Sequence, residues 1–367
     1  MGRFDRTDHA TLTDVARVAG VSRATAARAL GGYGSVSIEA RGRVEAAAAE
    51  LRYQPNELAR SMITGTTGTL GVVIADIELG FFAKAVRGIA DAANAEGFEV
   101  IVANTDEDLV KERAAVRVLV SKRVDGLIVV PAAPADAAHL EDAQDRGVPV
   151  VLLDRASASP RFDTVVVDNE RAARKAVNLL IGLGHRRIAI LVEGATARSA
   201  AELKAGPVPR GVLTSTLRQV GWAAALRAAN IPVTDALIRR STYGRQQARE
   251  ATSAALAEPG PPTAFLTTDE VMTIGAMDAI LGAGLRIPED VSLIGFDDVP
   301  WTTLVRPPLT VVAQPVHQLG ATATQRVLRR IAGADGPPEQ VVLRTSLVNR
   351  GSTGPPPGPP SSGRPRA

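Results

Sequence analysis

From Thr69 onward, short apolar runs alternate with amphipathic segments of helical length, and this alternation constrains the fold more than any other feature of the chain. Continuous apolar strands that alternate with helices are typical of parallel sheets covered on both faces. The strands are too many for one compact sheet, so two α/β lobes are expected. The predicted strands are Leu70–Ile74, Glu99–Ala103, Gly126–Val130, Val148–Leu152, Thr164–Val167, Ile188–Leu191, Ala264–Thr267 and Val291–Phe296.

The first 53 residues have a different pattern, in which apolar residues recur at helical spacing. Three helices are predicted, over Thr11–Ala19, Ser22–Leu30 and Ser37–Tyr53. Thr11 and Asp14 have the spacing of a capping box at the start of the first helix. The first two helices are separated only by a short turn that contains glycine, which is the arrangement of a helix-turn-helix.

The second helix has the features of a DNA-reading helix. Packing of Val15, Val21, Ala26 and Leu30 inward would leave Arg23, Ala24, Ala27 and Arg28 on or near its outer face. Arg can donate two hydrogen bonds to guanine, so Arg23 and Arg28 are the candidate base readers, whereas Ala24 offers only an apolar contact. Ser22 and Thr25 are expected to cap the helix and bind phosphate. Because the net charge of the 367 residues is only +3, contact with DNA must be local.

The N-terminal motifs identify a family. The sequence closely resembles the lactose-repressor (LacI/GalR) family through Asp14-Val15-Ala16, Ala19-Gly20-Val21-Ser22, Thr25, Arg28 and Leu30, then through Tyr53-Gln-Pro-Asn56, Ala59-Arg-Ser61 and Thr64-Gly65. The resemblance extends to Leu347–Thr353, except in residues 195–216 and the C-terminal tail. It implies an N-terminal all-α helix-turn-helix domain with a hinge helix, followed by a two-lobed α/β core like that of periplasmic binding proteins, with parallel sheets.

The resemblance also implies further DNA contacts. Thr11 lies at a DNA-contacting position, and Asn56 and Ala59 lie on the hinge-helix surface near the DNA. Met62 occupies the position of a Leu that wedges into the minor groove, and Met can also act as an apolar wedge. Packing of Met62 between domains is the alternative interpretation. Ala27 stands where the family often has Ser, which would remove one phosphate contact.

Polar residues that directly follow predicted strands are the candidate ligand groups, because such cores bind ligands near the carboxyl ends of their strands. Asp154, Thr268 and Asp297 are in such places; Asp269 is better explained as a helix N-cap. The family pattern adds Arg218, Tyr243 as a stacking aromatic, and Leu79, Phe81 and Phe82 at the cleft. Carboxylates with a guanidinium and aromatic rings suit a small polar ligand, a sugar or sugar derivative.

Two departures from the family pattern leave the identity of the effector open. Leu79-Gly80 replaces the common Asn-Pro pair, and Thr268 replaces an Asn, so that an amide donor is lost. His185 is interpreted as structural, and because the four His have no ligand spacing, no metal site and no cofactor are predicted.

The predicted domains are the helix-turn-helix domain 1–54, the hinge helix and linker 55–67, the ligand-binding and dimerisation core 68–350 and a disordered tail 351–367 rich in Pro, Gly and Ser. Residues 195–216 have no clear period. Without a signal peptide or membrane segment, a cytoplasmic protein is expected.

The predicted function is a sequence-specific DNA-binding transcriptional regulator, a homodimer on a near-palindromic operator whose affinity depends on the effector. Three alternatives are considered: a co-repressor type of regulator that is activated by ligand, a sugar-binding protein without catalysis, and an enzyme. An enzyme is disfavoured because the sequence has neither a nucleophile elbow, a phosphate-binding loop nor a metal-binding His pair, and Cys is absent. No leucine heptad supports a tetramer.

Overall fold

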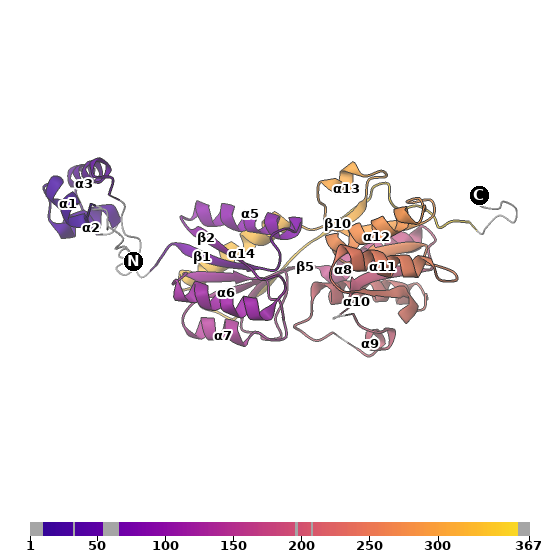
Figure 1. Ribbon diagram of the computed structural model, residues 1–367. Coiled ribbons are helices and arrows are strands. Elements are labelled where there is room, and N and C mark those ends of the chain that lie inside the picture. Colours follow the sequence, from indigo (N-terminus) through magenta and orange to yellow (C-terminus); the bar gives the residue numbers. More distant parts are fainter. Residues whose placement is uncertain (1–9, 32–33, 54–65, 195–196, 207, 359–367) are drawn as a thin grey trace, which may run out of the picture. The chain divides into compact units, whose positions relative to one another are not determined.

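The structure is a computed structural model that describes residues 10–31, 34–53, 66–194, 197–206 and 208–358. Contacts divide the chain into two units, Met1–Gly68 and Thr69–Ala367, which are described separately below (Figure 1). Within the part that the structure describes, no helix combines the length and the apolar character needed to cross a membrane.

In its described residues, the N-terminal unit contains helices α1 (Leu12–Val18), α2 (Arg23–Gly31) and α3 (Ile38–Glu50), as predicted. The capping box is present: Thr11 N donates to Asp14 Oδ2 at 3.0 Å, and Asp14 N donates to Thr11 Oγ1 at 3.4 Å. Gly20 has a φ of +65°, which the turn between α1 and α2 requires and which L side chains rarely adopt. The three helices share one small core of Val15, Ala16, Ala19, Ala26, Ala29, Val44, Ala47 and Ala48.

The first lobe of the core contains a six-stranded parallel sheet in the order β11-β5-β4-β3-β1-β2. Its strands are β1 (Thr69–Ile74), β2 (Glu99–Asn104), β3 (Gly126–Val129), β4 (Val150–Leu153), β5 (Asp163–Val167) and β11 (Gln340–Leu343). Successive residues face opposite sides, so that Val72 packs with α5 (Gly80–Ala95) and α14 (Val316–Ile331), whereas Val73 packs with α6 (Leu109–Ser121) and α7 (Ala138–Asp145). Both faces are therefore buried, which explains the continuous apolar runs.

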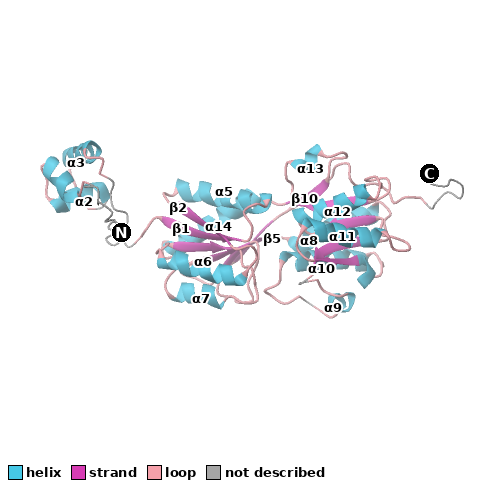
Figure 2. Ribbon diagram, viewed as in Figure 1, coloured by secondary structure: helices cyan, strands magenta, loops and turns pink. Residues whose placement is uncertain are grey.

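The second lobe again has strands between layers of helices (Figure 2). Its strand order is β12-β10-β9-β8-β6-β7, in which β12 pairs antiparallel with β10 and the other pairs are parallel. Its strands are β6 (Ile188–Glu193), β7 (Ile238–Ser241), β8 (Ala264–Thr267), β9 (Ser292–Phe296), β10 (Thr310–Ala313) and β12 (Ser346–Val348). One face is covered by α8 (Asn169–Gly182) and α10 (Thr214–Ala228), and the other by α11 (Arg245–Leu256) and α12 (Glu270–Gly282). The short helices α9 (Ala200–Lys204), η1 (Asp235–Leu237) and α13 (Trp301–Leu304) lie in connections.

The chain passes between the lobes at Asp168, at Gln314 and at Thr345. Two of these crossovers are bonded to each other, because Asp168 Oδ1 accepts from Thr345 N at 2.9 Å and from Thr345 Oγ1 at 2.8 Å. The two lobes are thus joined by neighbouring segments, which is the construction of a hinge.

The structure differs from the predictions in two segments and in four additional strands, β7, β10, β11 and β12. Residues 195–216, which have no clear period, contain α9 and the start of α10. The predicted disordered tail is wrong for its first residues: Ser352 is fully buried and its Oγ donates to Leu293 O at 2.6 Å while accepting from Thr310 N at 2.8 Å. These bonds attach this part of the tail to the first residues of β9 and β10. Residues 359–367 of that tail lie outside the described residues.

Candidate DNA-reading helix and ligand cleft

Helix α2 begins at a hydroxyl cap. Ser22 Oγ accepts from Thr25 N at 3.1 Å and lies 2.9 Å from Thr25 Oγ1. Arg28 Nη2 in turn donates to Thr25 Oγ1 at 3.4 Å, so that the three side chains form one exposed row. The expected cap at Ser22 is confirmed, and the row leaves most guanidinium donors of Arg28 available to a partner.

The two faces of α2 have different roles. Ala26 and Ala29 are buried against α1 and α3, while Arg23, Ala24 and Arg28 are exposed. Arg23 forms no ion pair with a described residue. Asn56, Ala59 and Met62, the predicted contacts of the hinge helix, lie outside the described residues.

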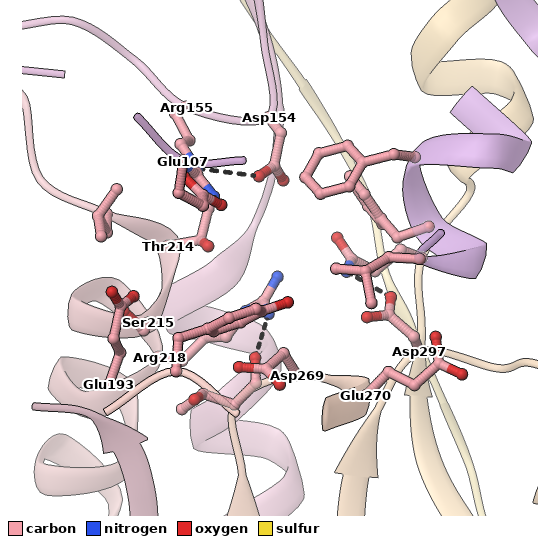
Figure 3. A pocket seen from close by; sticks show the side chains of 17 residues that line it. Glu107, Asp154, Arg155, Glu193, Thr214, Ser215, Arg218, Asp269, Glu270 and Asp297 are labelled. Carbon is pink, nitrogen blue, oxygen red and sulfur yellow. Dashed lines mark hydrogen bonds and ion pairs between the residues drawn. The ribbon is translucent and has the colours of Figure 1, made fainter. Parts of the chain in front are cut away.

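The eight predicted ligand residues line one cavity at the carboxyl ends of the strands. Leu79, Phe81, Phe82 and Asp154 come from the first lobe, and Arg218, Tyr243, Thr268 and Asp297 from the second. The cavity encloses about 620 Å³ of empty space, part of it open to solvent. The lining residues that were not among those eight are Glu107, Arg155, Glu193, Leu213, Thr214, Ser215, Asp269, Glu270 and Gln314 (Figure 3).

Aromatic side chains at the start of α5 form an apolar wall. Phe81 and Phe82 pack edge to face, with ring centroids 5.1 Å apart and an interplanar angle of 89°. Both rings are buried, and they pack in the core of the first lobe. Leu79 is the N-cap residue of α5, but its apolar side chain cannot accept a hydrogen bond from the backbone of the helix. Tyr243 remains 41% exposed, so its ring is accessible at the cavity.

Arg218 is held from three directions. Its Nε donates to Asn169 Oδ1 at 2.8 Å, its Nη1 donates to Thr268 O at 2.5 Å, and its guanidinium carbon lies 4.0 Å from the centroid of the Phe296 ring. The side chain is buried, so it is not an exposed salt-bridge partner. Burial lowers the pKa of the guanidinium from its usual value. Arg218 is therefore a fixed, desolvated donor at the cavity wall.

Asp154 and Arg155 directly follow β4 and bring opposite charges to the cavity. Arg155 binds Glu107 through two parallel bonds, Nη1 to Oε2 at 2.5 Å and Nη2 to Oε1 at 2.6 Å. Asp154 Oδ2 lies 3.8 Å from Arg155 Nε, whereas Asp154 Oδ1 is buried without a partner. Burial raises the pKa of Asp154.

Two further carboxyls lie at strand ends of the second lobe. Asp297 Oδ1 accepts from Gln314 Nε2 at 2.7 Å, and burial raises the pKa of Asp297 to about 6. Asp269 Oδ1 accepts from Met272 N at 2.8 Å, so the predicted N-cap is confirmed, although Asp269 also lines the cavity. Burial raises the pKa of Asp269 to about 6 as well.

Thr268 and His185 have local partners. Thr268 Oγ1 donates to Leu191 O at 3.0 Å, so toward the cavity this hydroxyl can act only as an acceptor. His185 lies 2.8 Å from Thr263 Oγ1 through Nδ1 and 2.9 Å from Gly354 O through Nε2, which confirms its structural role. Among the residues that the structure describes, no group of three His, Asp or Glu side chains could hold a metal ion.

Some of the additional lining residues also lie at or just after strand ends, where the sequence pattern could have indicated them. Glu107 and Arg155 follow β2 and β4, and Glu193 ends β6. Asp154 and Asp297 likewise follow β4 and β9. Ser215 lies at the start of α10, in the segment without a period, and no sequence signal indicates it.

Comparisons with known proteins agree with this architecture. Residues 11–56 match the model of bacterial regulatory proteins of the lacI family, and residues 177–353 match a periplasmic binding protein-like domain. The chain is 35% identical over 314 residues to catabolite control protein A of Priestia megaterium, covering 85% of this chain and 90% of that protein. It is 32% identical over 344 residues to the HTH-type transcriptional repressor CytR of Escherichia coli, covering 94% and 96%.

Two solved structures resemble nearly the whole chain. The lac repressor dimer bound to operator and the anti-inducer ONPF has a TM-score of 0.80 at 30% identity, covering 95% of this chain and 100% of that chain. The complex of the transcriptional regulator CelR with cellobiose has a TM-score of 0.68 at 27% identity, covering 94% and 99%. The first structure contains the lac repressor bound to operator, and the second contains CelR bound to the disaccharide cellobiose.

Proposed function

The chain belongs to the lacI family of bacterial regulatory proteins, and on that premise we propose that it is a transcriptional repressor whose affinity for operator DNA is set by a small polar ligand in the cleft. The observation that carries the proposal is the presence on one chain of a capped helix with exposed Arg23 and Arg28 and of a cavity lined by polar groups from two lobes.

For DNA we propose that Arg23 and Arg28 read bases, and that Thr11, Ser22 and Thr25 bind phosphate while Ala24 contributes an apolar contact. The hinge segment 55–67 would add Asn56 and Ala59 at the DNA and Met62 as a minor-groove wedge. The lac repressor is solved as a dimer on its operator, and we extend that arrangement to this chain, with a near-palindromic site. Such a repressor would act in the cytoplasm, on chromosomal DNA.

For the ligand we propose a sugar or a sugar derivative. Arg218 and the strand-end carboxylates supply charge-assisted hydrogen bonds to hydroxyl groups, while Phe81, Phe82 and Tyr243 can cover apolar ring faces. Solved relatives carry cellobiose or ribose. We propose binding without turnover, since the related proteins are regulators.

Coupling follows from the construction of the core. The cleft is lined by both lobes, so a ligand that contacts both favours one lobe arrangement over others. The lobes share their crossovers, and the first lobe begins directly after the linker to the DNA-binding unit. We propose that ligand binding lowers the DNA-competent population, with a coupling free energy of about 1–3 kcal/mol.

The test has two arms on the full-length protein. Selection from random DNA should yield a near-palindromic operator, and mobility shifts should then show its release by a sugar from a thermal-shift screen. Loss of sequence-selective DNA binding on deletion of residues 1–65, with ligand binding retained, is the expected result. Selective DNA binding by the core alone would overturn the proposal. Stronger operator binding in the presence of the ligand would show that the ligand acts as a co-repressor instead of releasing the operator.

A further inference from the structure

The cleft is strongly acidic. Two guanidinium groups, Arg155 and Arg218, face six carboxylates, a formal charge of −4 when all are ionised. The carboxylates come from both lobes and surround the open centre of the cavity (Figure 3): Glu107, Asp154, Glu193, Asp269, Glu270 and Asp297. Neutral sugars bind through hydroxyl groups that both donate and accept, and they do not need such an excess of negative charge.

The two guanidiniums of the cavity lining are outnumbered by its carboxylates. Arg155 forms two bonds to Glu107, while its Nε, 3.8 Å from Asp154 Oδ2, is a buried donor without a hydrogen-bond partner. Arg218 directs Nε and Nη1 to neutral oxygens, of Asn169 and Thr268, and makes no ion pair with any carboxylate among the described residues. Burial raises the pKa of the carboxyls of Asp154, Asp269 and Asp297, and the charge of Arg218 only partly offsets this effect.

A second and independent observation points to a missing donor. Asp154 is only 5% exposed, its Oδ1 has no hydrogen-bond partner, and the side chain points into the cavity (Figure 3). Glu270 Oε2 and Gln314 Oε1, which also line the cavity, are buried acceptors without partners. Buried acceptors are normally satisfied, so these oxygens are built for a ligand that donates several hydrogen bonds.

We infer that the effector carries a protonated amine beside its hydroxyl groups, as an amino sugar or an aminopolyol does, and that the ammonium binds between Asp154 of the first lobe and Asp297 of the second. An ammonium has three donors and no acceptor, which fits a wall of unsatisfied acceptors. It also bridges two like charges on opposite lobes, so the same contact that selects the ligand favours closure. This inference rests on the proposed function, because it specifies the ligand of the same cleft.

The test compares matched probes on the full-length protein. Tris(hydroxymethyl)aminomethane and tris(hydroxymethyl)ethane differ only by an ammonium in place of a methyl group, and glucosamine, galactosamine and mannosamine are each paired with the parent hexose. Titration calorimetry at pH 7 in phosphate buffer should give, in at least one pair, about tenfold or more tighter binding of the amine. Its affinity should fall as pH is lowered through 6, where Asp269 and Asp297 become protonated.

Two isosteric variants assign the effect to the cleft. Asp154→Asn and Asp297→Asn should bring the two members of the preferred pair within about twofold of each other, after thermal melting has shown that both variants are folded. Asp142→Asn, which removes an exposed carboxylate paired with Arg146 outside the cleft, is the control and should keep the full preference.

The outcomes separate this inference from the proposed function. Equal or tighter binding of the neutral member in every pair, or no binding by any probe, overturns the inference. So does a preference for the amine that survives in both variants. A neutral sugar that binds and releases operator DNA rejects the amine but keeps the proposed function. Absence of selective DNA binding rejects the proposed function whatever the cleft binds.

Discussion

Asp154 and Asp297 share an uncommon backbone conformation, with φ of +66° and +75° at the ends of β4 and β9. Asp tolerates this left-handed region better than most residues, yet it remains less favourable than an extended backbone. Both turns aim a carboxylate into the cavity. The strain at these two positions is therefore associated with the candidate ligand site, where packing of the surrounding strands enforces it.

The buried carboxyl of Asp269 should make stability depend on pH. Its pKa is about 6 in the folded chain and 3.8 in a model peptide, so the unfolded chain loses its proton first as pH rises. Stability is therefore lost between about pH 4 and 6 and stays lower above that range. Asn can also cap α12 but cannot ionise. We expect Asp269→Asn to be more stable than the wild type by about 1–3 kcal/mol at pH 7.5, and by much less at pH 4, in urea unfolding.

The control for that prediction is Asp108→Asn, since Asp108 caps α6 in an exposed position. This variant should show no comparable gain at pH 7.5. A stability difference between Asp269→Asn and the wild type that does not change with pH would contradict a raised pKa at Asp269.

Arg28 tests base reading at the DNA-binding helix. Lys keeps the positive charge but cannot form the paired donor geometry that guanine accepts. We expect Arg28→Lys to weaken operator binding by about 1–3 kcal/mol and to leave binding to a scrambled duplex nearly unchanged. Fluorescence anisotropy at one fixed salt concentration measures both. Equal losses on the two duplexes would assign Arg28 to phosphate contact instead.

Helix pairs cross at glycines throughout the core. A Cβ on Gly88 of α5 would lie 2.1 Å from His317 O, and one on Gly320 of α14 would lie 2.2 Å from Ala85 O. In the second lobe, a Cβ on Gly221 of α10 would lie 2.0 Å from Glu170 O at the start of α8. These neighbouring oxygens are backbone atoms, which cannot move without displacing a helix. Close helix approach therefore fixes these positions as glycine.

Substitution at one such crossing should be costly. Gly221→Ala must separate α10 from α8, and we expect a loss of about 3 kcal/mol or more in the free energy of unfolding, at the upper end of overpacking effects. Gly182→Ala at the end of α8 is the matched control, because nothing lies within 4 Å of its added methyl group. That control should be neutral or stabilising by up to about 1 kcal/mol. Similar stabilities of the two variants in urea unfolding would show that the helices can separate freely.

The sequence predicts elements well where local signals agree. Capping residues bound α1, α2 and α3, and apolar runs such as Leu70–Ile74 define central strands. Four strands, β7, β10, β11 and β12, are not predicted, because they are short and lie at or near sheet edges. β7 contains two Arg, and β11 is half exposed along its length. Their pairing depends on neighbours distant in the chain, which no local pattern contains.

The candidate site, too, can be predicted where a local sequence pattern indicates it, and not where it depends on contacts between distant segments. Asp154 and Asp297 follow apolar strands, so the position of the cleft can be inferred from strand ends. The pairing of Arg155 with Glu107, and the bond from Gln314 to Asp297, join segments that meet only in the folded core. The charge balance of the cavity depends on those pairings and cannot be read from the sequence alone.

At the scale of the whole molecule, the crossovers link the cleft to the arrangement of the lobes. Gln314 lies in one crossover and donates to Asp297 in the cavity, while Asp168 and Thr345 bond two other crossovers together. A ligand bound to both lobes therefore acts on segments that also set their relative position. The first lobe follows the linker to the DNA-binding unit in the chain. A single equilibrium between lobe arrangements can therefore affect the binding of both the effector and the operator.

Such an equilibrium requires reciprocity, which is our last prediction. If the effector weakens operator binding by a given factor, operator DNA must weaken effector binding by the same factor, expected at about 5- to 150-fold. Titration of the full-length protein with effector, free and saturated with operator, gives one factor; titration with operator, with and without effector, gives the other. A scrambled duplex of equal length is the control and should change effector affinity far less. A mutual weakening that reaches no limit and keeps growing with operator concentration would mean that the ligand competes for the DNA-binding surface instead of acting from the cleft.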